Sequence, residues 1–463
     1  MDSKPLNAFY TFRIGASKIE LLSWYTIPAM SLRHVLGSAA IALLGVAASF
    51  AQLSSESIFN IYYAQWTVYN GFLVKTLDTS GTAQHLNVLT YAFVNIGTNA
   101  AGQYECTSYD SWADNGTGAG ATPNTSVGGK GLPANGLTGN FGQLLLLKQR
   151  YPNLKIVITI GGGSLPPQAF SAVAATEASR KHFVSSCIAD YILGHFSGAF
   201  GQTPNQWETG VSVQGPPGPP VPDTPGLFDG IEIDWEYPAQ GDTANFTALM
   251  QAFRTQLDSI SNRRYLLSFD APAGEWAFQY INLPAVAQYC NYIDLMTYDY
   301  NGPWNNQTGF VAPLYQTKYD TDPTLNVAWT VDAYLAAGVP PQKILLGIPF
   351  YGYGWAVTGG NPAQEGQYET ATPLATSTQE FGYILTSLVP AMQEFRDSTT
   401  NDGKTATPWL FDGINFWTYD DSRSIAQKMR FARAKGLGGA FAWEASGDLP
   451  DGDLSNAMFF GLR

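Results

Sequence analysis

The chain has 463 residues, of which 45% are hydrophobic and only 13% are charged, and its formal net charge is −13. This length is sufficient for a large folded core. With 24 Lys and Arg against 37 Asp and Glu, the composition argues against binding of nucleic acid, which needs a basic surface. Aromatic residues make up 14% of the chain, which suits carbohydrate binding as well as an ordinary core.

The first 51 residues predict a segment that directs export. A basic pair at 33–34 precedes an apolar run over 35–46, and Ser49 and Ala51 occupy the −3 and −1 positions of a small-residue cleavage site. The run is shorter than a standard membrane span, so a secretory signal peptide is favoured over the alternative of a membrane anchor. We therefore expect a secreted protein that has no stable membrane association once the signal is removed.

From residue 58 onward, strand and helix signals alternate along the chain. Predicted strands cover 58–66, 85–93, 155–160, 228–238, 265–271, 292–297, 343–350 and 439–442, and predicted helices cover 141–151, 168–195, 243–260, 326–337 and 422–435. The polar residues 97–139 predict one long surface loop. After residue 355 the alternation stops for about sixty residues, until about 412, and then resumes.

Eight mostly apolar strands separated by helices predict a closed (β/α)8 barrel of parallel strands. A doubly wound open sheet is the alternative. That fold usually carries a Gly-rich phosphate loop after its first strand, whereas Gln65-Trp66-Thr67 stands there.

Residues 228–238 (FDGIEIDWEYP) carry the strongest functional signal. Three acidic residues, Glu232, Asp234 and Glu236, alternate with apolar residues, which predicts a β-strand with the carboxyls on one face, roughly 6.5–7 Å apart. A solvated edge strand could carry this charge, but it would not need isoleucine and tryptophan at every second position. The pattern predicts a barrel strand whose coupled carboxyls face a pocket.

Barrel enzymes carry their chemistry at the C-terminal ends of the strands. An aromatic residue at one such end is more often part of the core than a ligand platform, but recurrence at one face favours a substrate site. The residues expected there are Tyr62, Trp66, Phe93, Gly161, Gly162, Asp234, Glu236, Tyr237, Ala271, Gly274, Met296, Tyr298, Asp299, Tyr351 and Trp443.

The cysteines and histidines give no metal or disulfide pattern. The three cysteines, Cys106, Cys187 and Cys290, allow either one disulfide or three buried thiols. The four histidines form no ligand cluster, and neither CxxC nor HExxH occurs. We therefore expect no catalytic metal.

With these motifs in place, the chain resembles the glycoside hydrolase family 18 chitinases over about residues 58–463. The family motif D-G-x-D-x-D-x-E reads DGIEIDWE at 229–236, with Glu232 in place of the middle Asp, and Asp229 and Gly230 begin it. The motif S-x-G-G appears as TIGG at 159–162, and M-x-Y-D is intact as MTYD at 296–299. Residues 343–355 and 438–444 resemble the family's seventh and eighth strands.

The resemblance implies a (β/α)8 barrel with a small α+β insertion between strands seven and eight. On this basis we expect an N-terminal extension and signal peptide over 1–51. The barrel is expected over 52–355 and 413–463, with the insertion over 356–412.

The resemblance further implies retaining, substrate-assisted hydrolysis of β-1,4-linked N-acetylglucosamine, without a cofactor. Glu236 would be the general acid and base, Asp234 would turn toward the substrate acetamido group, Glu232 would share a proton with Asp234, and Tyr298 would bind the acetamido carbonyl. Trp443 would stack beneath the sugar that is cleaved, Tyr62 and Phe93 would close the acetamido pocket, and Asp299 would support the distorted sugar. Trp66, Trp304 and Trp355 would form outer subsites, and Gly161, Gly162, Tyr237, Met296 and Tyr351 would complete the substrate site.

The expected partner is chitin or its oligosaccharides, bound by a monomer. Two rival functions stay open. One is a chitin-binding lectin without activity, although such proteins typically lose the acid that Glu236 supplies here. The other is a related hydrolase of N-glycans or peptidoglycan.

Overall fold

The computed structural model describes residues 57–116, 121–196, 221–260, 264–317, 319–396 and 407–463, and a separate pair of two-residue strands, β1 (Arg13–Ile14) and β2 (Ser17–Lys18). The predicted signal-peptide cleavage site at Ala51 lies outside the described residues. The chain from Ser57 to Arg463 forms one unit. Among the described residues, no helix is both long and apolar enough to cross a membrane.

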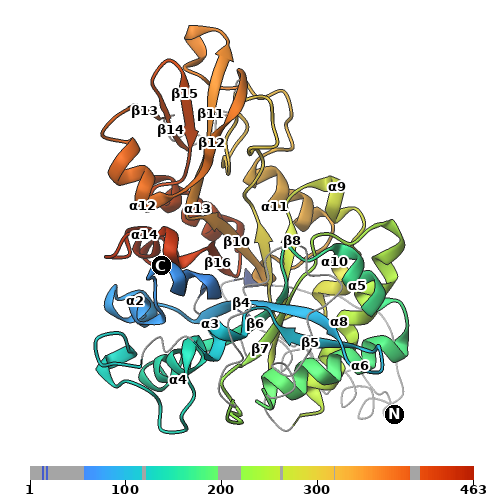
Figure 1. Ribbon diagram of the computed structural model, residues 1–463. Coiled ribbons are helices and arrows are strands. Elements are labelled where there is room, and N and C mark those ends of the chain that lie inside the picture. Colours follow the sequence, from blue (N-terminus) through green and yellow to red (C-terminus); the bar gives the residue numbers. More distant parts are fainter. Residues whose placement is uncertain are drawn as a thin grey trace, which may run out of the picture. The chain divides into compact units, whose positions relative to one another are not determined.

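A closed barrel of parallel strands forms the centre of this unit (Figure 1). The strands follow the order β3, β16, β10, β9, β8, β7, β6, β4, and pairing between β3 and β4 closes the ring. Their bounds are β3 (Ile58–Ala64), β4 (Val88–Thr98), β6 (Lys155–Gly161), β7 (Gly230–Asp234), β8 (Leu266–Pro272), β9 (Ile293–Met296), β10 (Ile344–Pro349) and β16 (Gly439–Trp443). The (β/α)8 prediction is confirmed, and the doubly wound alternative is wrong because an open sheet has no such closing pair.

Helices alternate with these strands along the chain. They are α2 (Val74–Thr79), α3 (Ser111–Asn115), α4 (Gly139–Arg150), α5 (Pro167–Ala174), α6 (Glu177–Cys187), α8 (Thr243–Asp258), α9 (Glu275–Phe278), α10 (Leu283–Ala287), α11 (Val327–Ala336), α13 (Ser422–Lys435) and α14 (Asp453–Gly461). Local sequence sets the ends of α13: the Asp421 side chain accepts the backbone N–H groups of Arg423 and Ser424, and Gly436 ends the helix at φ +68°.

The two faces of β7 meet different surroundings, as the alternation predicts. On the outer face, the ring of Trp235, which follows the strand, stacks on Phe170 of α5 at 5.3 Å and meets Phe246 of α8 edge-on at 5.5 Å. On the inner face, Glu232 is buried and hydrogen-bonded to side chains from β3, β6 and β8. The packing of Trp235 therefore holds the acidic residues toward the barrel interior.

Residues 97–139 are not one long loop, contrary to the sequence prediction. β4 continues to Thr98 and pairs antiparallel with β5 (Tyr104–Ser108), and α3 follows. A disulfide joins Cys106 of β5 to Cys187 at the end of α6, while Cys290 is a buried free thiol. Antiparallel pairing and the covalent link order a segment whose polar composition indicated only a loop.

A second sheet of five antiparallel strands lies between β10 and β16 in sequence, as expected for an insertion. Its order is β12 (Thr370–Glu380), β11 (Tyr351–Gly359), β15 (Asn415–Thr418), β14 (Pro408–Phe411) and β13 (Gln393–Arg396), with the short helix α12 (Phe381–Tyr383) beside it. Its first strand begins at Tyr351 and its last ends at Thr418, so the sheet includes residues that the sequence analysis assigned to the barrel.

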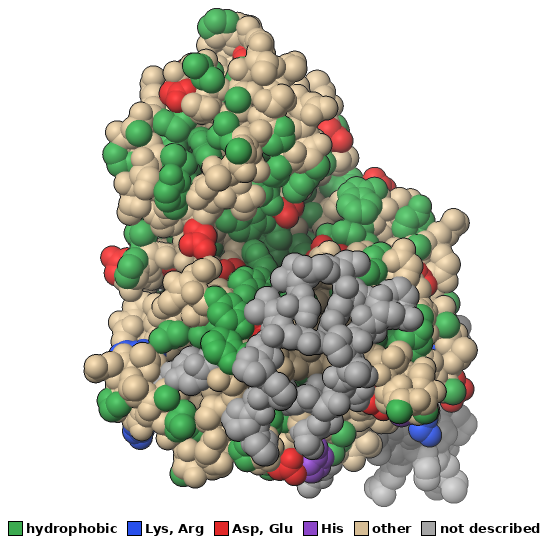
Figure 2. All heavy atoms as spheres, in the orientation of Figure 1, with side chains coloured by type: hydrophobic (Ala, Val, Ile, Leu, Met, Phe, Trp, Pro, Cys, Tyr) green, Lys and Arg blue, Asp and Glu red, His purple; other side chains and the backbone are tan. Residues whose placement is uncertain are grey.

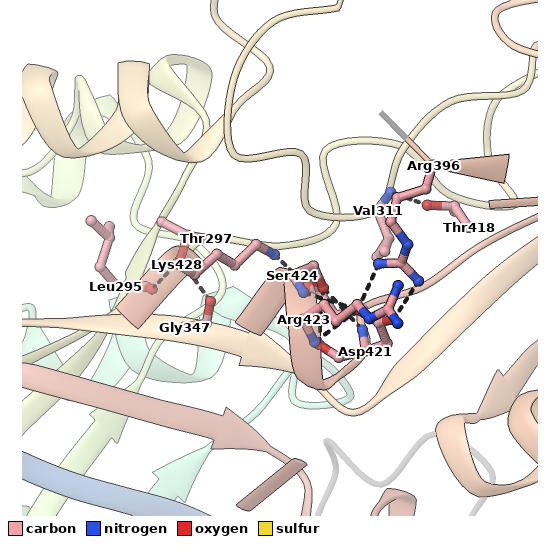
Figure 3. Close-up of polar contacts among 11 residues, drawn as sticks. Leu295, Thr297, Val311, Gly347, Arg396, Thr418, Asp421, Arg423, Ser424 and Lys428 are labelled. Carbon is pink, nitrogen blue, oxygen red and sulfur yellow. Dashed lines mark hydrogen bonds and ion pairs between the residues drawn. The ribbon is translucent and has the colours of Figure 1, made fainter. Parts of the chain in front are cut away.

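Polar contacts tie this sheet to the barrel helix α13 (Figure 3). The Arg396 guanidinium on β13 makes two hydrogen bonds to Asp421, at 2.5 and 3.1 Å, and Asp421 is also the N-cap of α13. Close by, the Val311 N–H donates to the Thr418 hydroxyl at 3.1 Å. The insertion therefore meets the barrel through a bidentate ion pair as well as through the continuous chain.

Candidate active site

Two carboxyls lie at the C-terminal end of β7. Asp234 is the last residue of the strand, and Glu236 follows two residues later. Burial raises the pKa of Asp234 well above its usual range, and the charges of Glu236 and Glu232 raise it further. Burial also raises the pKa of Glu236; a hydrogen bond from Tyr237 opposes this and the Asp299 charge adds to it. The pair therefore retains protons at a pH where an exposed carboxyl has lost them.

Glycines at the end of β6 let the backbone approach these carboxyls. Gly161 has φ +118°, and a Cβ there would lie 2.0 Å from the Asp234 carbonyl oxygen. Gly162 has φ +98°, and a Cβ there would lie 2.9 Å from the ring of Phe93. The Gly162 N–H donates to the Asp234 carbonyl at 3.0 Å. Only glycine fits these two positions, because any side chain would meet backbone or ring atoms.

The Glu232 carboxyl is fully buried and receives three hydroxyl groups. Tyr62 lies 2.5 Å and Thr159 2.9 Å from Oε2, and Ser268 lies 2.7 Å from Oε1. Glu232 is thus held in the barrel centre by donors from three other barrel strands, β6 and β8 beside β7 and β3 across the barrel, below the Asp234 carboxyl on the same strand.

Two further buried carboxyls, which the sequence analysis missed, lie beside Glu232. Asp270 on β8 contacts the Tyr62 hydroxyl at 2.6 Å, and Asp294 on β9 accepts the Asn60 amide at 3.1 Å. Burial raises the pKa of both well above the usual range of an aspartate, and the charge of Glu232 is the next cause for each. The sequence contains a signal that could have predicted both residues, because each alternates with apolar neighbours as the carboxyls of β7 do.

Aromatic rings form one wall above the carboxyls. Trp443 at the end of β16 stacks on Phe93 with centroids 5.6 Å apart, and also meets Trp66 at 6.3 Å and Tyr62 at 5.5 Å. Met296 at the end of β9 belongs to the same cluster, and Tyr298 packs against it. The structure therefore brings together most of the aromatic residues that the sequence predicted for this face.

Tyrosines from the insertion form a second group around Asp299. This residue has φ +60°, and its carboxylate accepts the hydroxyls of Tyr351 at 2.6 Å and Tyr353 at 3.0 Å. The Tyr298 ring meets that of Tyr351 edge-on at 6.3 Å. Burial, followed by the charge of Asp270, raises the pKa of the Tyr298 hydroxyl well above its usual value, so this group stays a hydrogen-bond donor.

A pocket of about 510 Å³ opens beside Trp443. It is lined by Phe350, Tyr351, Thr378, Gln379, Glu380, Tyr383, Trp443, Glu444 and Gly447, so the barrel and the insertion both contribute to it. Burial raises the pKa of Glu444 to about 7. Figure 2 shows the surface hollowed between the insertion and the barrel, with hydrophobic and acidic side chains in the hollow. Glu380 and Glu444 are lining residues that the sequence analysis missed.

Two predicted binding residues do not reach this surface. Trp355 is 0% exposed and packs in the core of the five-stranded sheet, where its indole N–H donates to the Asn305 carbonyl at 3.2 Å. Its prediction as an outer subsite is wrong, because no part of its ring is accessible. Tyr62 is also buried, and its hydroxyl is hydrogen-bonded to the carboxyls of Glu232 and Asp270. It therefore lies beneath the predicted substrate surface and holds these carboxyls in place.

Other predicted residues are open to solvent or act in the framework. Trp304 is 61% exposed and meets Tyr353 edge-on, while Tyr237 meets the exposed Trp276 edge-on at 5.1 Å. Asp229 lies at the opposite end of β7, where it pairs with Lys148 at 2.5 Å. A Cβ at Gly230 would lie 2.5 Å from Leu266 atoms, so this glycine allows close approach of β7 and β8.

Three of the buried carboxyls lie close enough together to suggest a metal site. Oxygen atoms of Glu232, Asp270 and Asp294 lie within 4.8 Å of one another. The Tyr62 hydroxyl oxygen lies 2.5, 2.6 and 3.4 Å from one oxygen of each carboxyl, and so fills the centre where a cation would need to bind. The three carboxyls and the tyrosine hydroxyl are therefore better suited to hydrogen bonds that share protons than to binding a metal ion.

The chain is similar in sequence to known proteins over most of its length. Residues 59–448 match the sequence profile described as glycosyl hydrolases family 18. The chain belongs to this family. It is 32% identical to chitinase A1 of Niallia circulans over 339 residues, which cover 67% of this chain and 43% of that one. It is 33% identical to chitinase C of Streptomyces lividans over 409 residues, which cover 85% and 57%. The chain therefore spans about half the length of these two relatives.

A solved structure of a chitinase has a similar fold. The catalytic domain of psychrophilic chitinase B from Arthrobacter TAD20 superposes with a TM-score of 0.74 at 32% identity, covering 88% of this chain and 95% of that domain. The barrel is thus the fold of a glycosyl hydrolase of family 18.

Proposed function

We propose that this chain is a chitinase that hydrolyses β-1,4-linked N-acetylglucosamine polymers with retention of configuration. The observation that carries the proposal is Glu236, a partly buried carboxyl with a raised pKa at the end of β7, next to Asp234 and below the aromatic wall. A general acid needs this combination, because it must hold a proton at the working pH and reach the glycosidic oxygen.

In the proposed mechanism the substrate supplies its own nucleophile. The acetamido carbonyl oxygen attacks the anomeric carbon while Glu236 gives its proton to the departing glycosidic oxygen, which leaves an oxazolinium ion and a Glu236 carboxylate. That carboxylate then removes a proton from water as the water opens the ring, which restores the acid. Two inversions at one carbon give net retention.

Neighbouring residues are assigned by their positions around this reaction. Asp234 receives the acetamido N–H and stabilises the positive charge of the oxazolinium ion, while Glu232 supports Asp234 from below. The Tyr298 hydroxyl donates to the acetamido carbonyl, and Asp299 holds the distorted sugar above Trp443. Further contacts to the sugar chain are assigned to Trp66, Phe93, Gly161, Gly162, Tyr237, Met296, Trp304 and Tyr351.

The test is hydrolysis of fluorogenic chitobioside and chitotrioside by the purified chain, followed by a time course of product lengths from chitin oligomers. We expect release of the fluorophore and short N-acetylglucosamine oligomers. Oligosaccharide binding by a folded protein without hydrolysis would identify a lectin instead. Faster turnover of a glycoprotein or of bacterial cell wall than of chitin would identify one of the related hydrolases.

We also propose that the chain is exported, with a signal peptide that ends near Ala51, and that it acts as a monomer. The small-residue pattern before Ala51 supports export. N-terminal sequencing of protein recovered from the culture medium should give Gln52 as the first residue, and light scattering should give the mass of one chain.

A further inference from the structure

The Tyr62 hydroxyl has more short contacts than its single proton can serve. Its oxygen lies 2.5 Å from Glu232 Oε2 and 2.6 Å from Asp270 Oδ1. Two oxygens at such distances need a proton between them, and Tyr62 can supply only one of the two. One of these two carboxyls must therefore be protonated and donate to the Tyr62 oxygen.

The surroundings decide which carboxyl holds that proton. Glu232 also receives Thr159 and Ser268, so with Tyr62 it accepts three hydroxyl donors, an arrangement that favours a carboxylate. Among the described residues, Asp270 hydrogen-bonds only to Tyr62, through Oδ1, and its buried Oδ2 has no hydrogen-bond partner. The negative charge is therefore better placed on Glu232, and the proton on Asp270.

The remaining groups around the cluster support a single charge. The hydroxyls and amide that face it from the strands are those of Asn60, Tyr62, Thr159, Ser268, Tyr292 and Tyr298, and the other carboxyls are Asp234 and Asp294. No Lys, Arg or His of the described residues hydrogen-bonds to these carboxyls. Without a cation, a second ionised carboxyl beside Glu232 would be strongly opposed in this buried centre.

We propose that Asp270 is a positioning residue held as a neutral carboxylic acid, which donates its proton to the Tyr62 oxygen and thereby directs the Tyr62 proton onto Glu232. The proton stays on Asp270 Oδ1, and no bond to carbon changes. This arrangement leaves one negative charge below Asp234 instead of two, so ionisation of Asp234 during the reaction meets the least opposition. The catalytic role rests on the proposed hydrolysis, whereas the proton assignment does not.

The test compares the wild type with Asp270→Asn, whose amide can donate to Tyr62 as the neutral acid does but never ionises. Asp451→Asn, at an exposed position, is the matched control. In infrared difference spectra at neutral pH, Asp270→Asn should lose one protonated-carboxyl band that the wild type and the control retain. Because the folded wild type binds this proton more tightly than the unfolded chain, its Tm should fall relative to that of Asp270→Asn as pH rises from about 4 to about 8.

Hydrolysis gives a third readout. On the acid side, where Asp270 is protonated, the pH profiles of kcat/KM of the wild type and Asp270→Asn should run parallel, and they should diverge only at alkaline pH.

If Asp270→Asn does not fold, Tyr62→Phe replaces it: the protonated-carboxyl band should then persist but shift in frequency, because Asp270 loses its acceptor.

Three results would overturn the proposal: no carboxyl band lost in Asp270→Asn, a Tm difference that does not change with pH, or one equivalent of divalent cation per chain by elemental analysis. A wild type that hydrolyses no substrate rejects the proposed function instead, and leaves the infrared and Tm results to decide the proton on Asp270.

Discussion

A few neighbouring residues determine the position and the pKa of the Glu236 carboxyl. Partial burial raises its pKa, Tyr237 donates to its carboxylate, and Asp299 adds a like charge across the cleft. A Cβ at Gly163 would lie 3.1 Å from its Oε1, so the loop after β6 packs directly against the acid. These contacts fix both the position and the protonation of one carboxyl.

Glu236→Gln should lower kcat by about 10²–10⁴-fold or more, because the amide has the same shape but cannot give up a proton to the leaving oxygen. Binding of chitin oligomers should be largely retained, as measured by calorimetry. The control is Glu177→Gln, at an exposed position on α6, which should behave as the wild type. Turnover of Glu236→Gln at the wild-type rate would reject the mechanism.

Glu232→Asp tests the residue at which residues 229–236 depart from the D-G-x-D-x-D-x-E motif that they resemble. The shorter side chain withdraws the carboxyl from Tyr62, Thr159 and Ser268, so its charge is less well stabilised. Because the Glu232 charge helps to raise the pKa of Asp234, we expect activity to persist with the acid limb of the kcat/KM profile moved to lower pH, by about one unit. An unchanged profile would mean that the two carboxyls are not coupled.

At the scale of elements, alternation along strands gave the reliable signal. The alternation that places Glu232 and Asp234 inside the barrel recurs in β8, where Leu267 and Phe269 face outward and Asp270 faces inward. The three acidic residues of β7 are conspicuous in the sequence, whereas one aspartate in an apolar run is not. The sequence is therefore sufficient to predict several carboxyls inside the barrel, although it does not predict which groups they contact.

The disulfide between β5 and α6 allows the contribution of one covalent link between elements to the stability of the fold to be tested. Its cysteines are 81 residues apart, and within the described part of the chain β5 pairs with β4 alone. Replacing both by serine should lower the free energy of unfolding by about 2–5 kcal/mol, because the unfolded chain gains freedom. Denaturant titration measures this. A reductant should destabilise the wild type and leave the double variant unaffected; equal responses would show that the bond does not form in solution.

At the scale of the whole molecule, the sequence predicted the barrel and its acidic strand but not the interior of the insertion. Barrel strands can be recognised in the sequence as apolar runs that are separated by predicted helices. Trp355 ends the run 343–355 that resembles the family's seventh strand, and the resemblance predicts it as an outer subsite, yet β11 pairs Trp355 with Phe416 of β15, about sixty residues later. Such antiparallel pairing depends on contacts remote in sequence, and polar strands such as β12 carry no alternation that would reveal it.

Buried carboxyls also set how the stability of the folded molecule depends on pH. Asp114 on α3 accepts the hydroxyls of Tyr91 at 2.5 Å and Ser108 at 2.6 Å, and burial raises its pKa to about 8. The folded chain therefore binds this proton more tightly than the unfolded chain, in which an aspartate titrates near pH 4. The resulting stabilisation is complete below that pH and is lost as pH rises toward about 8.

Asp114→Asn should remove this contribution. Across the window from about pH 4 to about pH 8, the free energy of unfolding of the wild type should fall by up to about 1.4 kcal/mol per pH unit more than that of the variant. Urea titrations at several pH values measure the difference, with Asp451→Asn as the control that should follow the wild type. A difference between Asp114→Asn and the wild type that stays constant over this window would show that Asp114 is ionised in the folded chain, with Tyr91 and Ser108 outweighing its burial.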